Sequence, residues 1–137
     1  MELKNGASIE FQPRPAITKE QLRAYADASG DHNSIHLDES AARKAGLPGI
    51  IAHGMLSAAF LADRAVGFMA GQGKWKLDRF QTRFKAMTLL GDVVSIGGSV
   101  KSASPSEVIL ELEARNQRGE TTTTGQAKFV RASCVLG

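Results

Sequence analysis

The stretch from Gly54 to Ala70 constrains the fold of this chain more than any other, because it is apolar on nearly every side. Its hydrophobic side chains are interrupted only by Ser57, Asp63 and Arg64. The segment predicts one long helix, and a helix that is apolar all round has to be enclosed by the rest of its domain. The remainder of the chain must therefore supply a layer that covers this helix.

The second half of the sequence predicts that layer as a set of strands. Strand-like segments occupy residues 75–86, 92–103, 106–117 and 121–133, and turn residues separate them at hairpin-like intervals. Near the N-terminus, Ile9 and Phe11 alternate with polar neighbours ahead of Pro13, which indicates one more short strand. This order predicts an α+β domain, with an antiparallel five-stranded sheet that covers the long helix.

Two shorter helices are predicted between the first strand and the long helix. Thr18 and Gln21 form a capping pattern, so a helix should begin there and end at Ser29-Gly30. Its buried side should carry Leu22, Tyr25 and Ala26. A second short helix should run from Asp38 to Gly46, because acids begin this stretch and bases precede its glycine.

Size and composition fit one soluble domain spanning residues 1–137, with 42% apolar and 23% charged residues. The N-terminus lacks the apolar core of a signal peptide, and no stretch is apolar enough for a membrane span, so we expect a cytoplasmic protein. Cys134 is the only cysteine, which leaves no internal disulfide. With three histidines besides, no cluster has zinc-ligand spacing, and we expect no metal.

The net charge of +3 is compatible with a polyanionic partner, but its distribution along the chain argues against nucleic acid. The basic residues are scattered, without the runs that are typical of nucleic-acid binding. A nucleotide-carrying thioester such as an acyl-CoA would make use of the same charge.

The candidate catalytic pair is Asp31 and His36, which lie five residues apart on a Gly- and Asn-rich connection. A carboxylate and an imidazole that flank one water can share its protons, one accepting while the other donates. Burial in an apolar tunnel would make Asp31 a stronger base at neutral pH. The alternative is that Asp31 caps a turn and His36 is a satisfied core histidine.

Four further residues have supporting roles in this hypothesis. Asn33 is expected to hydrogen-bond the backbone of its own turn rather than take part in chemistry. A glycine at position 54, on the first turn of the long helix, would let a ligand approach a free backbone N–H, or would only permit tight packing. His53 is expected to cap or pack that helix rather than act as a base, and Ser57 is a weaker candidate ligand group.

These residues together resemble the MaoC-like, (R)-specific enoyl-CoA hydratase family. The resemblance rests on Gly30-Asp31-x-Asn33-x-x-His36, on Ala52-His53-Gly54-Met55, and on Phe84-Lys85-Ala86 and Leu90-Gly91-Asp92 in the second half. It implies the hot-dog fold, in which an antiparallel sheet wraps around a long central helix. The predicted order of elements is the same.

The resemblance also implies a reaction, the addition of water to a trans-2-enoyl thioester to give the (R)-3-hydroxyacyl product, or its reverse. Asp31 and His36 would hold the water, and the Gly54 N–H would hold the thioester carbonyl. Asp31 would take the proton of the water while His36 protonates the α-carbon. No cofactor is implied, since the thioester already polarises the double bond. The substrate would be carried by CoA or acyl carrier protein, and the protein would form a homodimer or larger assembly, or pair with a related subunit.

Two positions depart from the family pattern, and two other functions remain open. Ser34 stands where the family usually has proline, and Ala62 stands where some members carry a serine near the catalytic pair. A hot-dog thioesterase would need only Asp31 and a water that attacks the carbonyl carbon. A non-enzymatic acyl-binding subunit would need neither member of the pair, so the presence of both favours the hydratase.

Overall fold

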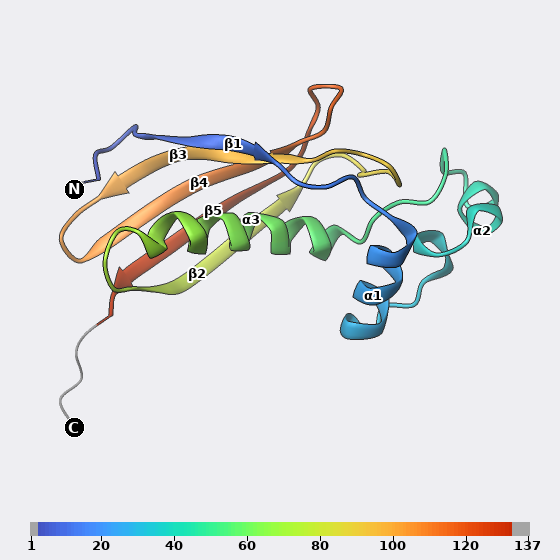
Figure 1. The fold of residues 1–137 in the computed structure, drawn as a ribbon, viewed down its shortest axis with the longest axis horizontal. Coiled ribbons are helices and arrows are strands. Elements are labelled where there is room, and N and C mark those ends of the chain that lie inside the picture. Colours follow the sequence, from blue (N-terminus) through green and yellow to red (C-terminus); the bar gives the residue numbers. More distant parts are fainter. Residues whose placement is uncertain (1–2, 133–137) are drawn as a thin grey trace.

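The chain folds into an α+β structure in which an antiparallel sheet covers one long helix (Figure 1). The computed structural model describes residues 3–132. Within these residues the elements are β1 (Ser8–Pro13), α1 (Lys19–Ser29), the 3-10 helix η1 (Ser34–His36), α2 (Glu39–Lys44), α3 (Gly54–Ala70), β2 (Trp75–Phe84), β3 (Ser95–Ala103), β4 (Glu107–Arg115) and β5 (Thr121–Arg131). Every helix and strand predicted from the sequence is present, and η1 is an addition.

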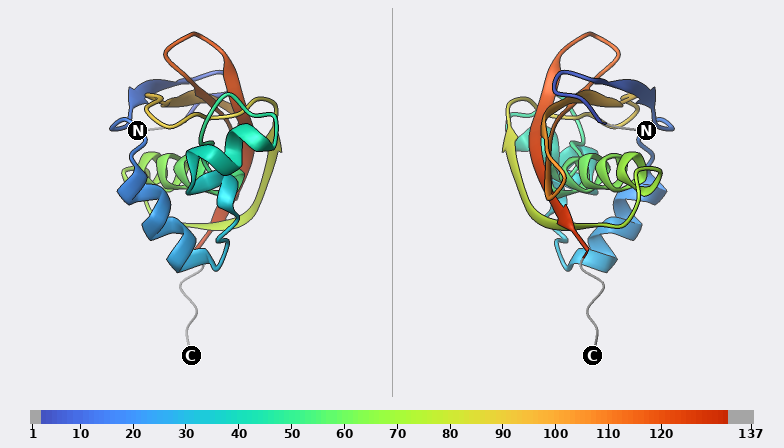
Figure 2. Two further views of the ribbon diagram at one scale, coloured as in Figure 1. Left: turned by 90° about the vertical axis from the view of Figure 1, so that its right-hand side faces the viewer. Right: turned by 90° about the vertical axis from the view of Figure 1, so that its left-hand side faces the viewer.

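The five strands form one sheet in the order β1-β3-β4-β5-β2, and all neighbouring pairs are antiparallel. Consecutive hairpins join β3, β4 and β5, whereas β1 and β2 lie at opposite edges. The chain therefore crosses the sheet between β1 and β2, and α3 makes this crossing. Seen end on, the sheet curves around α3 (Figure 2). This arrangement confirms the predicted hot-dog fold.

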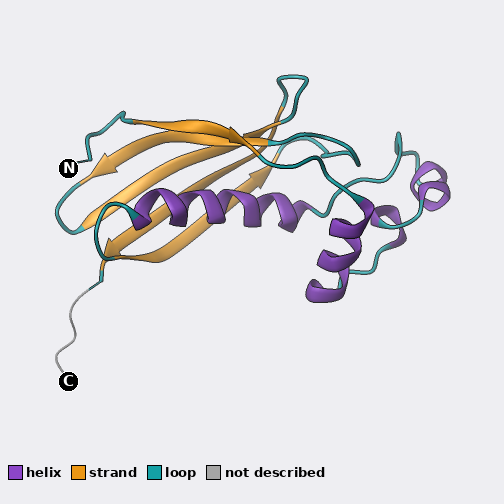
Figure 3. Cartoon of the chain, in the orientation of Figure 1, coloured by secondary structure: helices purple, strands orange, loops and turns teal. Residues whose placement is uncertain are grey.

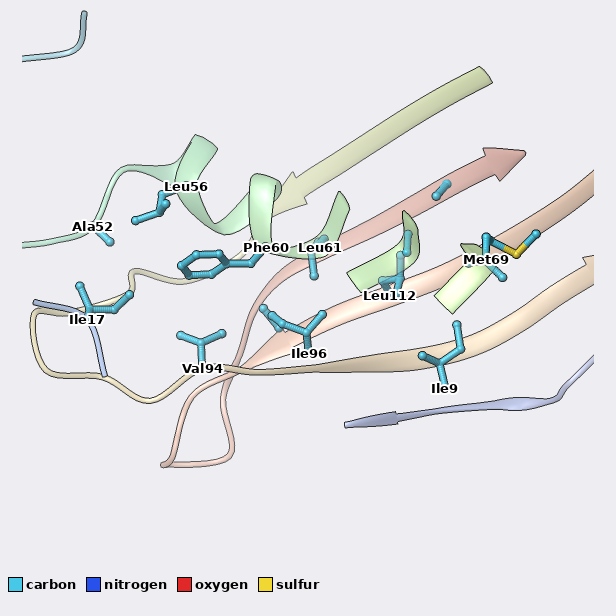
Figure 4. Close-up of a cluster of buried hydrophobic side chains, with 14 of the residues drawn as sticks. Ile9, Ile17, Ala52, Leu56, Phe60, Leu61, Met69, Val94, Ile96 and Leu112 are labelled. Atoms are coloured by element: carbon cyan, nitrogen blue, oxygen red, sulfur yellow. The ribbon is translucent and has the colours of Figure 1, made fainter. Parts of the chain in front are cut away.

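The core lies between α3 and the face of the sheet that curves around it (Figure 4). From α3 it contains Leu56, Phe60, Leu61, Ala65 and Met69, and from the strands Ile9, Ile96, Val100, Val108, Leu110, Leu112, Ala114, Ala127 and Phe129. The expected enclosure of α3 on every side is wrong, because the sheet covers only one side of it. On its outer side Met55 is 60% exposed and Val66 is 49% exposed.

The three shorter helices gather beyond the N-terminal end of α3 (Figure 3). The predicted starts of α1 and α2 are confirmed at Thr18, whose Oγ1 accepts from the Gln21 N–H at 3.1 Å, and at Asp38, whose Oδ1 accepts from the Ser40 N–H at 3.2 Å. The helix predicted to run to Gly46 ends at Lys44. Leu22 and Ala26 are buried as predicted, and Tyr25 is half-buried. Within residues 3–132, no helix is long and apolar enough to cross a membrane. Cys134 and the predicted last strand residue, 133, lie outside the described residues.

A buried carboxylate, Asp92, joins the loop after β2 to the hairpin between β4 and β5. The Asp92 side chain accepts hydrogen bonds from Arg118 at 2.9 and 3.1 Å, from Gln117 Nε2 at 3.0 Å and from the Leu89 N–H at 2.9 Å. Burial raises the pKa of Asp92, but these hydrogen bonds and the Arg118 charge outweigh burial and hold that pKa below its ordinary value of 3.8. β3 begins at Ser95 instead of the predicted residue 92, because Asp92 belongs to this network.

The same loop holds the segment that leads into α3. The Ala52 N–H donates to the Thr88 carbonyl at 2.8 Å, and the Leu90 N–H donates to the Ile50 carbonyl at 3.0 Å. Asp92 therefore stabilises the segment that precedes His53 and Gly54.

Replacing Asp92 by Asn should lower the free energy of unfolding at pH 7 by about 1–3 kcal/mol, because Arg118 and Gln117 lose a charged acceptor. A carboxyl with a lowered pKa in the folded state stabilises the protein above its unfolded pKa, and this contribution is lost as the pH falls through the folded pKa. The difference in the free energy of unfolding between wild type and Asp92→Asn should therefore have its full size at pH 7 and decrease below about pH 4. Urea denaturation at several pH values measures it.

Asp78→Asn is the matched control, because Asp78 is an exposed acid whose carboxylate lies 3.8 Å from Lys128 Nζ. It should change stability by less than about 1 kcal/mol. Equal stability of Asp92→Asn and wild type at pH 7 would contradict the assigned role of Asp92.

Candidate active site

The loop that carries the predicted catalytic pair is fixed at both ends by local hydrogen bonds. Gly30 ends α1 in the left-handed conformation, with φ of 81°, and its N–H donates to the Ala26 carbonyl at 2.9 Å. Asn33 caps η1, since its Oδ1 accepts from the Ile35 N–H at 3.3 Å. The sequence predicted this local role for Asn33. The loop between Asp31 and His36 is thereby held as a short, defined turn.

The side chains of Asp31 and His36 face each other across this turn. Asp31 Oδ2 lies 3.9 Å from His36 Nε2, while Asp31 Oδ1 accepts from the Asn33 N–H at 3.2 Å. One oxygen of Asp31 therefore caps the turn, as the alternative interpretation predicted, while the other faces the imidazole. A water within about 2.8 Å of both facing atoms would form a bent bridge, with an angle of roughly 90° at its oxygen.

Burial of the two groups is unequal. The His36 side chain is 8% exposed, but that of Asp31 is 52% exposed, so the expected burial of Asp31 in an apolar tunnel is wrong for the single chain. His36 Nδ1 lies 2.8 Å from the Ile51 carbonyl oxygen. A carbonyl can only accept, so Nδ1 carries a proton and Nε2 is the ring nitrogen left free to bond another group. That atom faces Asp31.

His53 connects the pair to the start of α3. It is 2% exposed, its Nε2–H donates to the Asp31 carbonyl oxygen at 3.0 Å, and its ring stacks on that of His36 with 3.9 Å between centroids. The Tyr25 ring packs against the His53 ring, with 4.9 Å between the ring centroids. Among residues 3–132 the buried Nδ1 of His53 has no hydrogen-bond partner. His53 packs as predicted, but its side chain makes no capping hydrogen bond to α3.

Gly54 begins α3 and lines a pocket of about 330 Å³. The first N–H groups of a helix have no intrahelical partner, so this end of α3 presents backbone donors. Ser57, which is 3% exposed, lines the same pocket one turn later. In the described part of the chain, the lining residues include neither Asp31 nor His36. The pocket therefore adjoins the helix end rather than the exposed carboxylate.

The sequence singled out Phe84, Lys85 and Ala86 as part of the family resemblance, but it did not predict that they form the far wall of this pocket. The wall is formed by Phe84, the last residue of β2, by the residues Lys85, Ala86, Met87 and Thr88 that follow it, and by Thr123 of β5. Phe84 and Met87 are 50% and 46% exposed. Two large apolar side chains beside a turn are the sequence signal for such a wall, but only the β2–β5 pairing places them opposite Gly54.

Asp31, His36 and His53 lie close enough to one another to be considered as ligands of a metal ion. One ligand atom from each lies within 4.8 Å of the others. Tetrahedral zinc ligands at about 2.0 Å from the ion would lie only about 3.3 Å apart. The two rings are stacked within 26° of parallel, so their nitrogen lone pairs converge poorly. This geometry suits a water between Asp31 and His36 better than a cation.

Comparison with known families and curated proteins gives consistent matches. Residues 2–122 match the family model described as "MaoC like domain". The chain is 32% identical over 109 residues to the fatty acid synthase beta subunit TOXC of Cochliobolus carbonum, over 79% of this chain and 5% of that protein. It is 49% identical over 51 residues to 3-hydroxyacyl-thioester dehydratase X of Mycobacterium tuberculosis, over 34% of this chain and 18% of that protein. The chain thus spans only a small part of the length of these relatives.

Solved structures show the same fold. R-hydratase PhaJ1 from Pseudomonas aeruginosa superposes with a TM-score of 0.81 at 28% identity, over 95% of this chain and 83% of that chain. An (R)-hydratase from A. caviae superposes with a TM-score of 0.85, over 96% of this chain and 98% of that chain. Its identity is 23%, so this second likeness concerns the fold alone.

Proposed function

Because the chain belongs to the MaoC-like domain family, we propose that it adds water to trans-2-enoyl thioesters to give (R)-3-hydroxyacyl thioesters, or catalyses the reverse dehydration. One observation carries the proposal, namely that Asp31 Oδ2 lies 3.9 Å from His36 Nε2. An acid and an imidazole at this distance can hold one water and move its protons in both directions. The names of the hydratase and dehydratase relatives support the same reaction class.

In the hydration direction, Asp31 begins ionised and His36 begins protonated on Nε2. The water oxygen bonds to the β-carbon as one of its protons passes to Asp31 Oδ2, and the electrons of the double bond move onto the α-carbon and carbonyl. His36 Nε2 then gives its proton to the α-carbon. The next water relays the proton from Asp31 to His36 and resets the pair, so one molecule of water is consumed in each cycle.

Gly54 would stabilise the negative charge that develops on the thioester oxygen. Its backbone N–H belongs to the start of α3, where the helix dipole also favours negative charge. Ser57 is a second polar group of the same pocket. His53 would act as a positioning residue, because it contacts both the Asp31 carbonyl and the His36 ring.

The substrate would be carried by CoA or by acyl carrier protein, and no cofactor takes part in the proposed steps. We also propose that the chain works as a homodimer or a larger assembly. Phe84 and Met87 line the pocket and are half-exposed, and Met55, which follows Gly54 in the chain, is exposed as well; a second protomer would cover these apolar side chains. Pairing with a related subunit is the alternative, since solved structures with the same fold include the ChsH1-ChsH2 and HadBC complexes of Mycobacterium tuberculosis.

The experiment that tests the proposal follows crotonyl-CoA with two readouts. The enoyl absorbance should fall without release of free thiol, and chiral analysis should show the (R)-3-hydroxy product. Release of thiol in step with the loss of substrate would indicate a thioesterase instead. Binding of the acyl-CoA without turnover would indicate a non-enzymatic acyl-binding subunit.

A further inference from the structure

Phe84 lies beside Gly54, and both residues line the same pocket. The three atoms nearest to the position of a Cβ on Gly54 all belong to the Phe84 ring, at 3.3, 3.5 and 3.5 Å. The ring therefore occupies the space beside the first residue of α3. A group that approaches the Gly54 N–H from the pocket comes close to this ring, because both residues line that pocket.

The backbone beneath this ring is firmly held. Phe84 pairs with Thr123 of β5, and the N–H groups of Lys85 and Ala86 donate to the Thr122 carbonyl at 2.8 and 3.1 Å. The ring itself is 50% exposed on this fixed base. Its position relative to Gly54 is thus set by the sheet, whereas the outer part of the pocket is open.

We infer that Phe84 determines substrate specificity at the α-carbon by leaving room for hydrogen but not for a methyl group. This inference rests on the proposed function, in which the thioester carbonyl accepts from the Gly54 N–H. A carbonyl oxygen in that hydrogen bond lies about 2.9 Å from the nitrogen, so the attached α-carbon lies within about 5 Å of it. An α-methyl group directed toward the side of Gly54 on which the Phe84 ring lies then has no room.

The test compares crotonyl-CoA with 2-methylcrotonyl-CoA, which differs from it by one α-methyl group. The measured quantity is the ratio of kcat/KM for the two substrates, in wild type and in Phe84→Ala. The lower intrinsic reactivity of the methylated substrate cancels when the ratios of two variants are compared. One methyl group in a tight pocket changes kcat/KM by about 10–200-fold, so the preference for crotonyl-CoA should shrink by about tenfold or more in Phe84→Ala.

Met87→Ala is the matched control, because Met87 lines the same pocket and is similarly exposed, but none of the three atoms nearest to the Gly54 Cβ position belongs to it. Its ratio should stay within about twofold of wild type. Phe84→Leu keeps an apolar side chain and should give an intermediate ratio. It also provides the test if Phe84→Ala does not fold, which thermal unfolding of each variant will show.

Two negative outcomes are distinguishable. If wild type hydrates crotonyl-CoA but the ratio is unchanged in Phe84→Ala, or falls equally in Met87→Ala, the inference is wrong and the proposed function stands. If wild type does not hydrate crotonyl-CoA, the proposed function fails, and the role of Phe84 fails with it.

Discussion

Replacing Asp31 by Asn should reduce kcat for crotonyl-CoA hydration by about two to four orders of magnitude, the usual contribution of a positioned acid or base. An amide cannot take the proton of the water. Its oxygen can still accept the hydrogen bond from the Asn33 N–H, and the side chain is half-exposed, so the fold should be retained. Initial rates and urea denaturation of the same preparation measure the two effects separately.

Asp27→Asn is the matched control for Asp31. Asp27 lies on the exposed side of α1 and contacts His32 at 2.9 Å, so it has the same chemistry nearby without facing His36. It should keep wild-type turnover within about twofold. Near-normal rates in Asp31→Asn would show that Asp31 only caps its turn.

Replacing His36 by Gln should cause a loss of similar size, because no group would remain to exchange a proton at the position of Nε2. Glutamine can donate a hydrogen bond to the Ile51 carbonyl, the partner of His36 Nδ1 in this structure. Alanine would leave that carbonyl without its partner and would confuse stability with catalysis. The rate of hydration and the thermal unfolding temperature together give the result.

His32→Gln serves as the control, since His32 lies on the same loop and is exposed. The double variant Asp31→Asn/His36→Gln should be little slower than either single variant, because residues that act as a unit are not additive. Multiplication of the two losses would mean that Asp31 and His36 act independently. Hydration retained in His36→Gln would contradict the role of His36, and release of free thiol by this variant would favour the thioesterase, which needs only the carboxylate.

The fold could be predicted because its main constraint is local. The apolar stretch of α3 and the turn residues between the strands specify their elements without reference to distant contacts, and the sheet follows from the need to cover the helix. The exposure of Met55 and Val66 could not be predicted in this way, because hydrophobicity does not show which side of a helix the sheet leaves open. The turn η1 was missed because its three residues carry no periodic signal.

The site was only partly predictable, because some of its contacts are local in the sequence and others join residues far apart in the chain. The spacing of Asp31 and His36, five residues apart, is a local feature that the sequence displays. The hydrogen bond from His53 to the Asp31 carbonyl spans 22 residues, and that between Arg118 and Asp92 spans 26. Likewise, the contact of Phe84 with Gly54 depends on where the sheet places β2. Such contacts depend on the tertiary structure and leave no pattern along the chain.

Hydration of crotonyl-CoA in water enriched in heavy oxygen, followed by mass spectrometry, tests the central claim most directly. If Asp31 and His36 deliver water to the β-carbon, the product is intact 3-hydroxybutyryl-CoA with one heavy oxygen in its hydroxyl group. Crotonate with a heavy oxygen in its carboxylate, together with free CoA, would show attack at the carbonyl carbon and contradict the account. Unchanged, unlabelled crotonyl-CoA would contradict it as well.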